Sequence, residues 1–134
     1  MKISKIIILL TTLFLLACTS KNKLELDFSN PLKKEDFKIE IQILGSDVNR
    51  KVIYDGNVTY EIPNEYGEND WHFNYKDSLH GYFRHFKTNR NDNHNYTFHF
   101  FQKENNVFAE IKIDGISKEE LKTISFTKNK KDFR

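Results

Sequence analysis

Apolar residues recur at every second position through most of this chain, in short runs that begin near Phe37. Isoleucine occupies alternate positions in the segment 39–43, and aromatic residues do so in the segment 71–75. A period of two sends neighbouring side chains to opposite faces, so each run predicts a half-buried β-strand. The chain contains 12 Phe, six Tyr and one Trp, and aromatic residues suit such a pleated surface. The pattern therefore predicts a small all-β domain with an aromatic core.

Turn residues divide this pattern into hairpins. Asp55-Gly56 predicts a type I′ turn between two strands within 52–62. The segment 77–81 predicts a turn before a strand at 82–86. Both faces of that strand are partly aromatic, so its register against the preceding strand stays open.

Asn105-Asn106 predicts a further two-residue turn. This turn sets a register that pairs Phe98 with Ile113 and Phe100 with Ile111. The apolar pairs share one face, as the inner face of a hairpin requires. We therefore expect that face to meet the core.

The C-terminal part adds one helical signal. Ser117 to Glu120 fits a capping box, with Ile116 and Leu121 at the positions of a hydrophobic staple. One or two helical turns are expected there, followed by a last strand at 123–127. No repeat, long amphipathic helix or βαβ pattern occurs. The predicted fold is a small antiparallel β-sandwich, immunoglobulin or transthyretin-like, or a half-open barrel, with one short helical turn near the C-terminus.

The N-terminus has the layout of an export signal. Lys2 and Lys5 precede an apolar run of 12 residues, 6–17, which ends at Cys18. As a helix this run spans ~18 Å, short of the ~30 Å hydrocarbon layer of a bilayer, so a cleaved signal is favoured over a membrane anchor. The segment Leu15-Leu16-Ala17-Cys18 resembles the lipobox of bacterial lipoproteins. This resemblance covers residues 1–18 alone.

The resemblance implies that the chain is cut before Cys18 and that the cysteine is lipidated. The expected organisation is a signal peptide at 1–17, a lipidated N-terminus and tether at 18–36, and one β-rich domain at 37–134 with a basic tail. Alternating apolar residues at 24, 26 and 28 leave a short edge strand open as an alternative. The expected location is the cell membrane or outer membrane, facing the periplasm or the cell exterior. Thr19 in place of Asp favours the outer membrane.

Loss of the leader changes the charge and the thiol chemistry. Without Lys2 and Lys5 the 21 basic side chains fall to 19, equal to the 19 acidic ones. A neutral domain without a clustered basic surface argues against a nucleic-acid partner. Cys18 is the only cysteine, so its acylation leaves no thiol for a disulfide, a metal or a nucleophile. No cofactor is expected.

The remaining polar residues form no catalytic motif. Neighbouring carboxylates fall in predicted loops or helix starts, and neither a Gly-x-Ser-x-Gly sequence nor a phosphate-binding glycine loop is present. Among the histidines, His72, His85 and His99 meet across neighbouring strands only if the open register allows it. We therefore expect a protein that is not an enzyme and has no metal site.

The sequence favours a membrane-anchored module that binds a protein or glycan partner. Aromatic anchors dominate interface energies, and the candidate partner-binding residues are Trp71, Tyr75, Tyr82 and Phe101. An inhibitor or immunity-type lipoprotein that blocks an envelope enzyme is the alternative, and a small metal-binding lipoprotein is the third class. Cys18 is the expected lipidation site.

Overall fold

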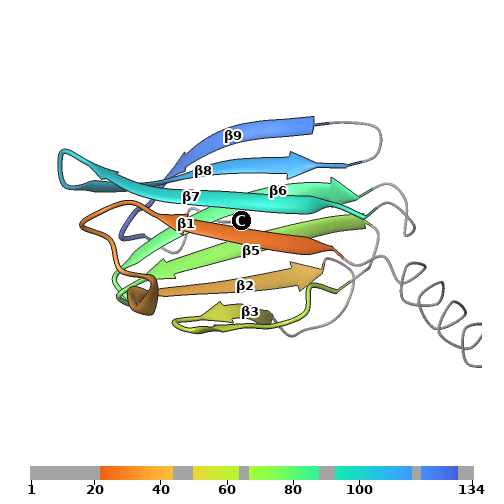
Figure 1. Ribbon diagram of the computed structural model, residues 1–134, viewed down its shortest axis with the longest axis horizontal. Coiled ribbons are helices and arrows are strands. Elements are labelled where there is room, and N and C mark those ends of the chain that lie inside the picture. The colour runs from red at the N-terminus through yellow and green to blue at the C-terminus, as the bar shows by residue number, and fades with distance from the viewer. Residues whose placement is uncertain (1–21, 44–49, 64–66, 88–92, 116–118, 130–134) are drawn as a thin grey trace, which may run out of the picture.

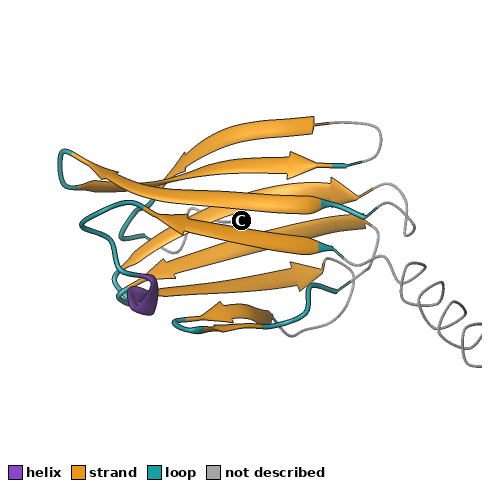
Figure 2. Cartoon of the chain, viewed as in Figure 1, coloured by secondary structure: helices purple, strands orange, loops and turns teal. Residues whose placement is uncertain are grey.

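Two β-sheets pack face to face in the computed structural model, which describes residues 22–43, 50–63, 67–87, 93–115 and 119–129 (Figures 1 and 2). The strands in these ranges are β1 (Lys23–Phe28), β2 (Phe37–Ile43), β3 (Lys51–Asp55), β4 (Val58–Thr59), β5 (Gly67–Tyr75), β6 (Leu79–Lys87), β7 (Asn95–Lys103), β8 (Asn106–Asp114) and β9 (Glu119–Ser125). The four-stranded sheet has the order β1-β7-β8-β9, and the five-stranded sheet the order β4-β3-β2-β5-β6. The predicted all-β sandwich is confirmed.

Residues 23–28, within the tether predicted at 18–36, form strand β1. This strand pairs in parallel with β7, whereas the other strand pairs are antiparallel. Leu24, Leu26 and Phe28 pack against the core. The tether prediction is therefore wrong for these residues, and the edge-strand alternative is the one that forms.

The β7–β8 hairpin turns at Glu104-Asn105, one residue earlier than predicted. Both residues have positive φ, 52° and 66°, as a type I′ turn requires. Phe100 therefore pairs with Ala109 rather than with Ile111. The predicted register is wrong by two residues, but an even shift leaves every side chain on its predicted face.

The β3–β4 turn also differs from its prediction by one residue. Gly56-Asn57 makes the turn, between the paired residues Asp55 and Val58. Gly56 has a φ of 64°, and Asn57 is not among the residues with positive φ. A type I′ turn needs positive φ at both positions, so that prediction is wrong.

The β5–β6 hairpin settles the register that the sequence left open. A three-residue turn, Lys76–Ser78, aligns Tyr75 with Leu79 and Trp71 with Phe83. Large aromatic side chains then line the inner face of both strands. The outer face carries Glu68, Asp70 and His72 from β5, and Tyr82, Arg84 and Phe86 from β6.

The helical turn predicted near the C-terminus is wrong for residues 119–121, which lie in β9. Residues 116–118, which contain the start of the capping box, lie outside the described residues. β9 pairs with β8 along its whole length, from Glu119 opposite Asp114 to Ser125 opposite Phe108. A whole ladder of interstrand hydrogen bonds outweighs a local cap worth about 1 kcal/mol. Within the described ranges the helical structure is the 3₁₀ turn η1 (Lys34–Asp36).

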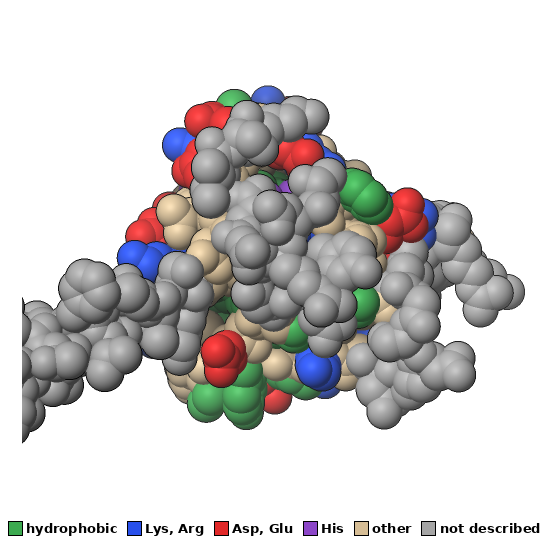
Figure 3. Space-filling model, turned by 90° about the vertical axis from the view of Figure 1, so that its right-hand side faces the viewer, with side chains coloured by type: hydrophobic (Ala, Val, Ile, Leu, Met, Phe, Trp, Pro, Cys, Tyr) green, Lys and Arg blue, Asp and Glu red, His purple; other side chains and the backbone are tan. Residues whose placement is uncertain are grey.

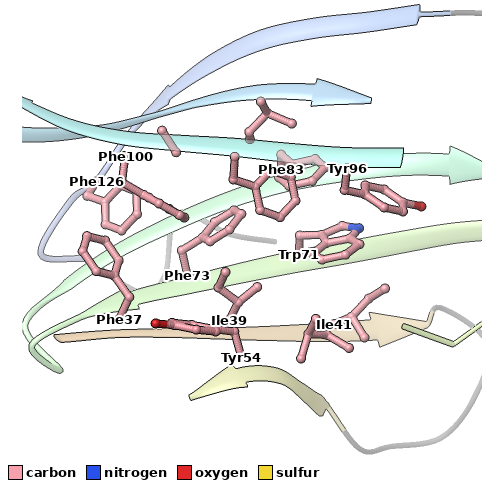
Figure 4. Packing of buried hydrophobic residues seen from close by; sticks show 14 of the residues in the cluster. Phe37, Ile39, Ile41, Tyr54, Trp71, Phe73, Phe83, Tyr96, Phe100 and Phe126 are labelled. Atoms are coloured by element: carbon pink, nitrogen blue, oxygen red, sulfur yellow. The ribbon is translucent and has the colours of Figure 1, made fainter. Parts of the chain in front are cut away.

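The core is an aromatic layer between the two sheets (Figure 4). Trp71, Phe73, Phe98 and Phe100 are fully buried. Phe73 and Phe98 meet edge to face with ring centroids 5.3 Å apart, and Phe73 and Phe100 do so at 5.7 Å. Such geometries add about 0.5–1.5 kcal/mol per pair to the effect of burial.

The two sheets join along one side, between β6 and β9. His80 and Thr127 exchange backbone hydrogen bonds of 2.7 and 2.8 Å. Phe126 packs beside them over Gly81, where a Cβ atom would lie 2.8 Å from the Phe126 ring. Gly81 therefore allows the C-terminal segment to cover the edge of β6, so the sandwich is closed on this side.

Candidate functional site

Trp71, the first predicted partner-binding residue, is a core residue. Its exposed fraction is 0%, and its ring packs against Tyr96 at 4.8 Å and Phe83 at 5.7 Å between centroids. Trp71 is therefore not accessible to a partner, and its place among the candidate partner-binding residues is corrected. Its position in an alternating strand fits either face, and only the sheet packing selects the inner one.

Tyr75 lies on the inner face as well, beside the β5–β6 turn. It is half-buried and packs against Phe37, with ring centroids 4.9 Å apart. The ammonium of Lys76 lies 5.3 Å from the centre of its ring. Tyr75 thus presents one edge to solvent while its ring supports the core.

Tyr82 lies on the outer face of the five-stranded sheet, in a fixed polar group. Its hydroxyl donates to Asp70 Oδ1 at 2.9 Å. Arg84 donates to both carboxylate oxygens of Asp70, from Nε at 2.8 Å and from Nη2 at 3.3 Å. Burial and the hydrogen bond to Asp70 raise the pKa of Tyr82. The hydrogen bond to Asp70 likewise raises the pKa of Arg84, so the guanidinium stays charged and oriented.

Two further residues extend this group along the outer face. Glu68 lies 3.6 Å from Arg84 Nη1, and Phe86 is 58% exposed. Glu68 pairs with Phe86 and Asp70 pairs with Arg84 across the strands. We call Glu68, Asp70, Tyr82, Arg84 and Phe86 the Arg84 patch.

Arg84, Asp70 and Phe86 were not among the site residues predicted from the sequence. Opposite charges favour each other across a strand pair, so the Asp70–Arg84 pairing was a usable signal for the open register. That register also places Trp71 opposite Phe83. A register that satisfies both the charge pair and the aromatic pair would have placed Asp70 and Arg84 together on the outer face of the sheet.

His72 lies next to the Arg84 patch, on the same face. Its ring centroid is 5.4 Å from that of Tyr82, and its exposed fraction is 5%. Burial, and then the charge of Arg50, lower the pKa of His72 to about 4. The imidazole is therefore neutral near pH 7.

Phe101 lies on the outer face of the other, four-stranded sheet. It is half-buried and stacks on Phe108 with centroids 5.4 Å apart. His99 lies on the same face, where Nε2 is 2.6 Å from the Ser29 hydroxyl and Nδ1 is 3.7 Å from a Glu110 carboxylate oxygen. Phe101 and Tyr82 thus belong to opposite surfaces of the sandwich, so the four predicted residues do not form one site.

The three histidines named as a possible cluster do not meet. His72 faces outward from β5, and His85 faces inward from β6, because its cross-strand partner is Asn69 rather than His72. His99 lies on the four-stranded sheet. In the part of the chain that the structure describes, no three His, Cys, Asp or Glu side chains are grouped to hold a metal ion.

His85 instead meets His94 between the sheets. The ring centroids are 4.9 Å apart, and the exposed fractions are 3% and 6%. Tyr96 contacts both rings, at 5.9 and 6.0 Å. Burial lowers the pKa of His85, and Glu120 opposes this effect in part.

Cys18 lies outside the described residues. Among the residues that are described, none forms a helix long and apolar enough to cross a membrane. No protein-family model, curated protein or solved structure matches this chain.

Proposed function

We propose that this protein is a lipid-anchored envelope lipoprotein whose β-sandwich binds a protein or glycan partner through the Arg84 patch. One observation carries the proposal. The side chain of Arg84 is 45% exposed, yet Asp70 holds its guanidinium in a single orientation, beside the exposed ring of Phe86. Arg and Tyr are among the residue types that dominate interface energies.

The fixed position of Arg84 favours binding. Two hydrogen bonds to one carboxylate restrict the side chain before any partner arrives. Ordering a flexible side chain at an interface costs about 0.5–1.5 kcal/mol, and this cost is reduced here. Phe86 adds apolar area that solvent otherwise contacts.

The anchor places one end of the sandwich near the bilayer. Five residue steps separate Cys18 from Lys23, where β1 starts, and an extended chain covers ~17 Å over that distance. The β7–β8 hairpin lies at the opposite end (Figure 1). Seen from the β1 end, acidic and basic side chains are both scattered over the visible described surface (Figure 3). In this proposal the lipid on Cys18 provides the attachment.

The lipid anchor is tested at Cys18. Cys18→Ser is expected to abolish incorporation of labelled fatty acid and to leave an uncleaved precursor, because the sulfur that accepts the lipid is gone. Metabolic labelling followed by electrophoresis measures both effects. Continued labelling of the Ser variant would contradict the lipoprotein assignment.

The binding surface is tested at Arg84 and Phe86. Arg84→Ala and Phe86→Ala are each expected to reduce partner recovery roughly 30-fold, the equivalent of about 2 kcal/mol. The measurement is quantitative crosslinking in isolated envelopes, followed by mass spectrometry of the captured protein or glycan.

Phe101→Ala is the matched control, because Phe101 is an aromatic on the other sheet face. It should recover the partner at the wild-type yield. Equal recovery by all three variants would place the binding surface outside the Arg84 patch.

A further inference from the structure

The two buried histidines lie at one end of the space between the sheets, each positioned by a different sheet. His85 faces inward near the end of β6. His94 precedes β7, and its backbone is held by the β1 end: its N–H donates to Asn22 Oδ1 at 2.9 Å, and its carbonyl accepts from Lys23 N–H at 3.1 Å. The N-terminal strand thus fixes His94 opposite His85.

Glu120 orients the imidazole of His85. The His85 Nδ1 atom lies 3.3 Å from Glu120 Oε2, so Nδ1 carries the ring hydrogen and its N–H donates a hydrogen bond to the carboxylate. In the imidazole tautomer with its hydrogen on Nδ1, Nε2 is the nitrogen with the lone pair. In the described part of the chain, that atom is buried and has no hydrogen-bond partner. A histidine held by a carboxylate through one nitrogen, with the other nitrogen unprotonated, is the usual arrangement of a metal ligand.

A third possible metal ligand lies on the neighbouring strand. Asn69 is the register partner of His85 and is 4% exposed, and its Oδ1 atom is buried without a hydrogen-bond partner among the described residues. A buried polar atom left unpaired costs about 1–3 kcal/mol, so an ion or a water molecule bound to these two acceptors removes that cost.

The ring spacing matches shared coordination. With metal–nitrogen bonds of ~2.0–2.1 Å and a tetrahedral angle, two imidazoles on one ion have centroids ~5 Å apart. The observed value is 4.9 Å. Imidazole nitrogen and amide oxygen are ligands that Zn²⁺ and Cu²⁺ accept.

The geometry points to a transition-metal site in which His85 Nε2, a ring nitrogen of His94 and Asn69 Oδ1 bind one Zn²⁺ or Cu²⁺ ion, with water in the remaining position. Lys87 faces the same space and is 1% exposed. Its ammonium weakens cation binding, and the Glu120 carboxylate offsets that charge. The site does not depend on the Arg84 patch or on the lipid anchor.

Trp71 provides a built-in reporter for this site. It is the only tryptophan, and it lies on the same face of β5 as Asn69 and in contact with Tyr96. The full-length protein, purified in detergent without a histidine tag and stripped with chelator, is titrated with CuCl₂ and with ZnCl₂. One equivalent of Cu²⁺ should quench the Trp71 fluorescence, and calorimetry should show one Zn²⁺ ion per chain.

Variants identify the ligands. His85→Gln and His94→Gln should each weaken binding at least 10-fold, and Glu120→Gln should weaken it about 10- to 100-fold because it removes the carboxylate behind His85. The matched controls are His72→Gln and His99→Gln, which alter outward-facing histidines and should bind as the wild type does.

The wild-type protein gives an independent readout if a variant fails to fold. Pulsed electron paramagnetic resonance of the Cu²⁺ form should show coupling to two imidazole rings. Coupling to no imidazole, absence of stoichiometric binding, or wild-type affinity in folded His85→Gln and His94→Gln would each overturn the site and leave ordered water as the occupant.

Discussion

Trp71→Ala is expected to lower the free energy of unfolding by about 3–5 kcal/mol, the usual cost of removing a large aromatic from a core. The side chain is fully buried and packs between Phe83 on its own sheet and Tyr96 on the other. Its removal leaves a cavity that rigid strands on both sides fill only in part. A domain of this size has a total stability of about 5–15 kcal/mol, so the loss is a large fraction of it.

Urea unfolding followed by far-ultraviolet circular dichroism measures this effect without relying on tryptophan fluorescence. The matched control is Phe86→Ala, since Phe86 is 58% exposed; the expected change there is within about 0.5 kcal/mol. If Trp71→Ala costs no more than Phe86→Ala, Trp71 does not lie in the core.

Acid is expected to destabilise the protein between pH 6.5 and about 4 because His72 is buried as the neutral base. Its pKa is about 4 in the folded state, against the ordinary histidine value of about 6.5 in the unfolded chain. Over this range the unfolded state binds more protons, so stability falls as the pH falls. This loss of stability is small above pH 7 and reaches about 2 kcal/mol at pH 5. The pKa of His85 is lowered too, so it acts in the same direction.

The measurement compares the free energy of unfolding at pH 7 and pH 5 in the wild type and in His72→Gln. Glutamine does not titrate, so the difference between the two pH values should shrink by about 2 kcal/mol in the variant. Circular dichroism at both pH values shows whether each protein starts from the same fold. An unchanged difference would mean that His72 is protonated in the native state.

Period-two patterning predicted the faces of the strands better than it predicted their partners. Ile39 and Ile41 are buried as expected. The β7–β8 turn was misplaced by one residue, yet Phe98 and Phe100 still face the core, because the resulting shift in pairing is even. Local alternation specifies a face directly, whereas register depends on which turn geometry the backbone adopts.

Pairing between strands that are far apart in the sequence accounts for the main errors in the predicted secondary structure. Nothing in the sequence near residues 23–28 indicates that they add in parallel to β7, roughly 70 residues away. The capping box at Ser117 favours a helix locally, but the edge of β8 offers hydrogen bonds that draw residues 119–125 into a strand. In both cases a distant strand supplies interactions that local propensity cannot represent.

For the candidate sites, too, the sequence predicted some features and the tertiary structure decided the others. The sequence by itself determined that the domain is all-β and that its core is aromatic, and it showed that residues 15–18 resemble the lipobox of bacterial lipoproteins. Only the tertiary structure decided that Trp71 is buried, that Asp70 holds Arg84 on an outer face, and that His85 meets His94 rather than His72 or His99. A strand pattern divides side chains into two faces, but which face meets the other sheet, and which residues become neighbours across it, is set by register and packing between segments far apart in the chain.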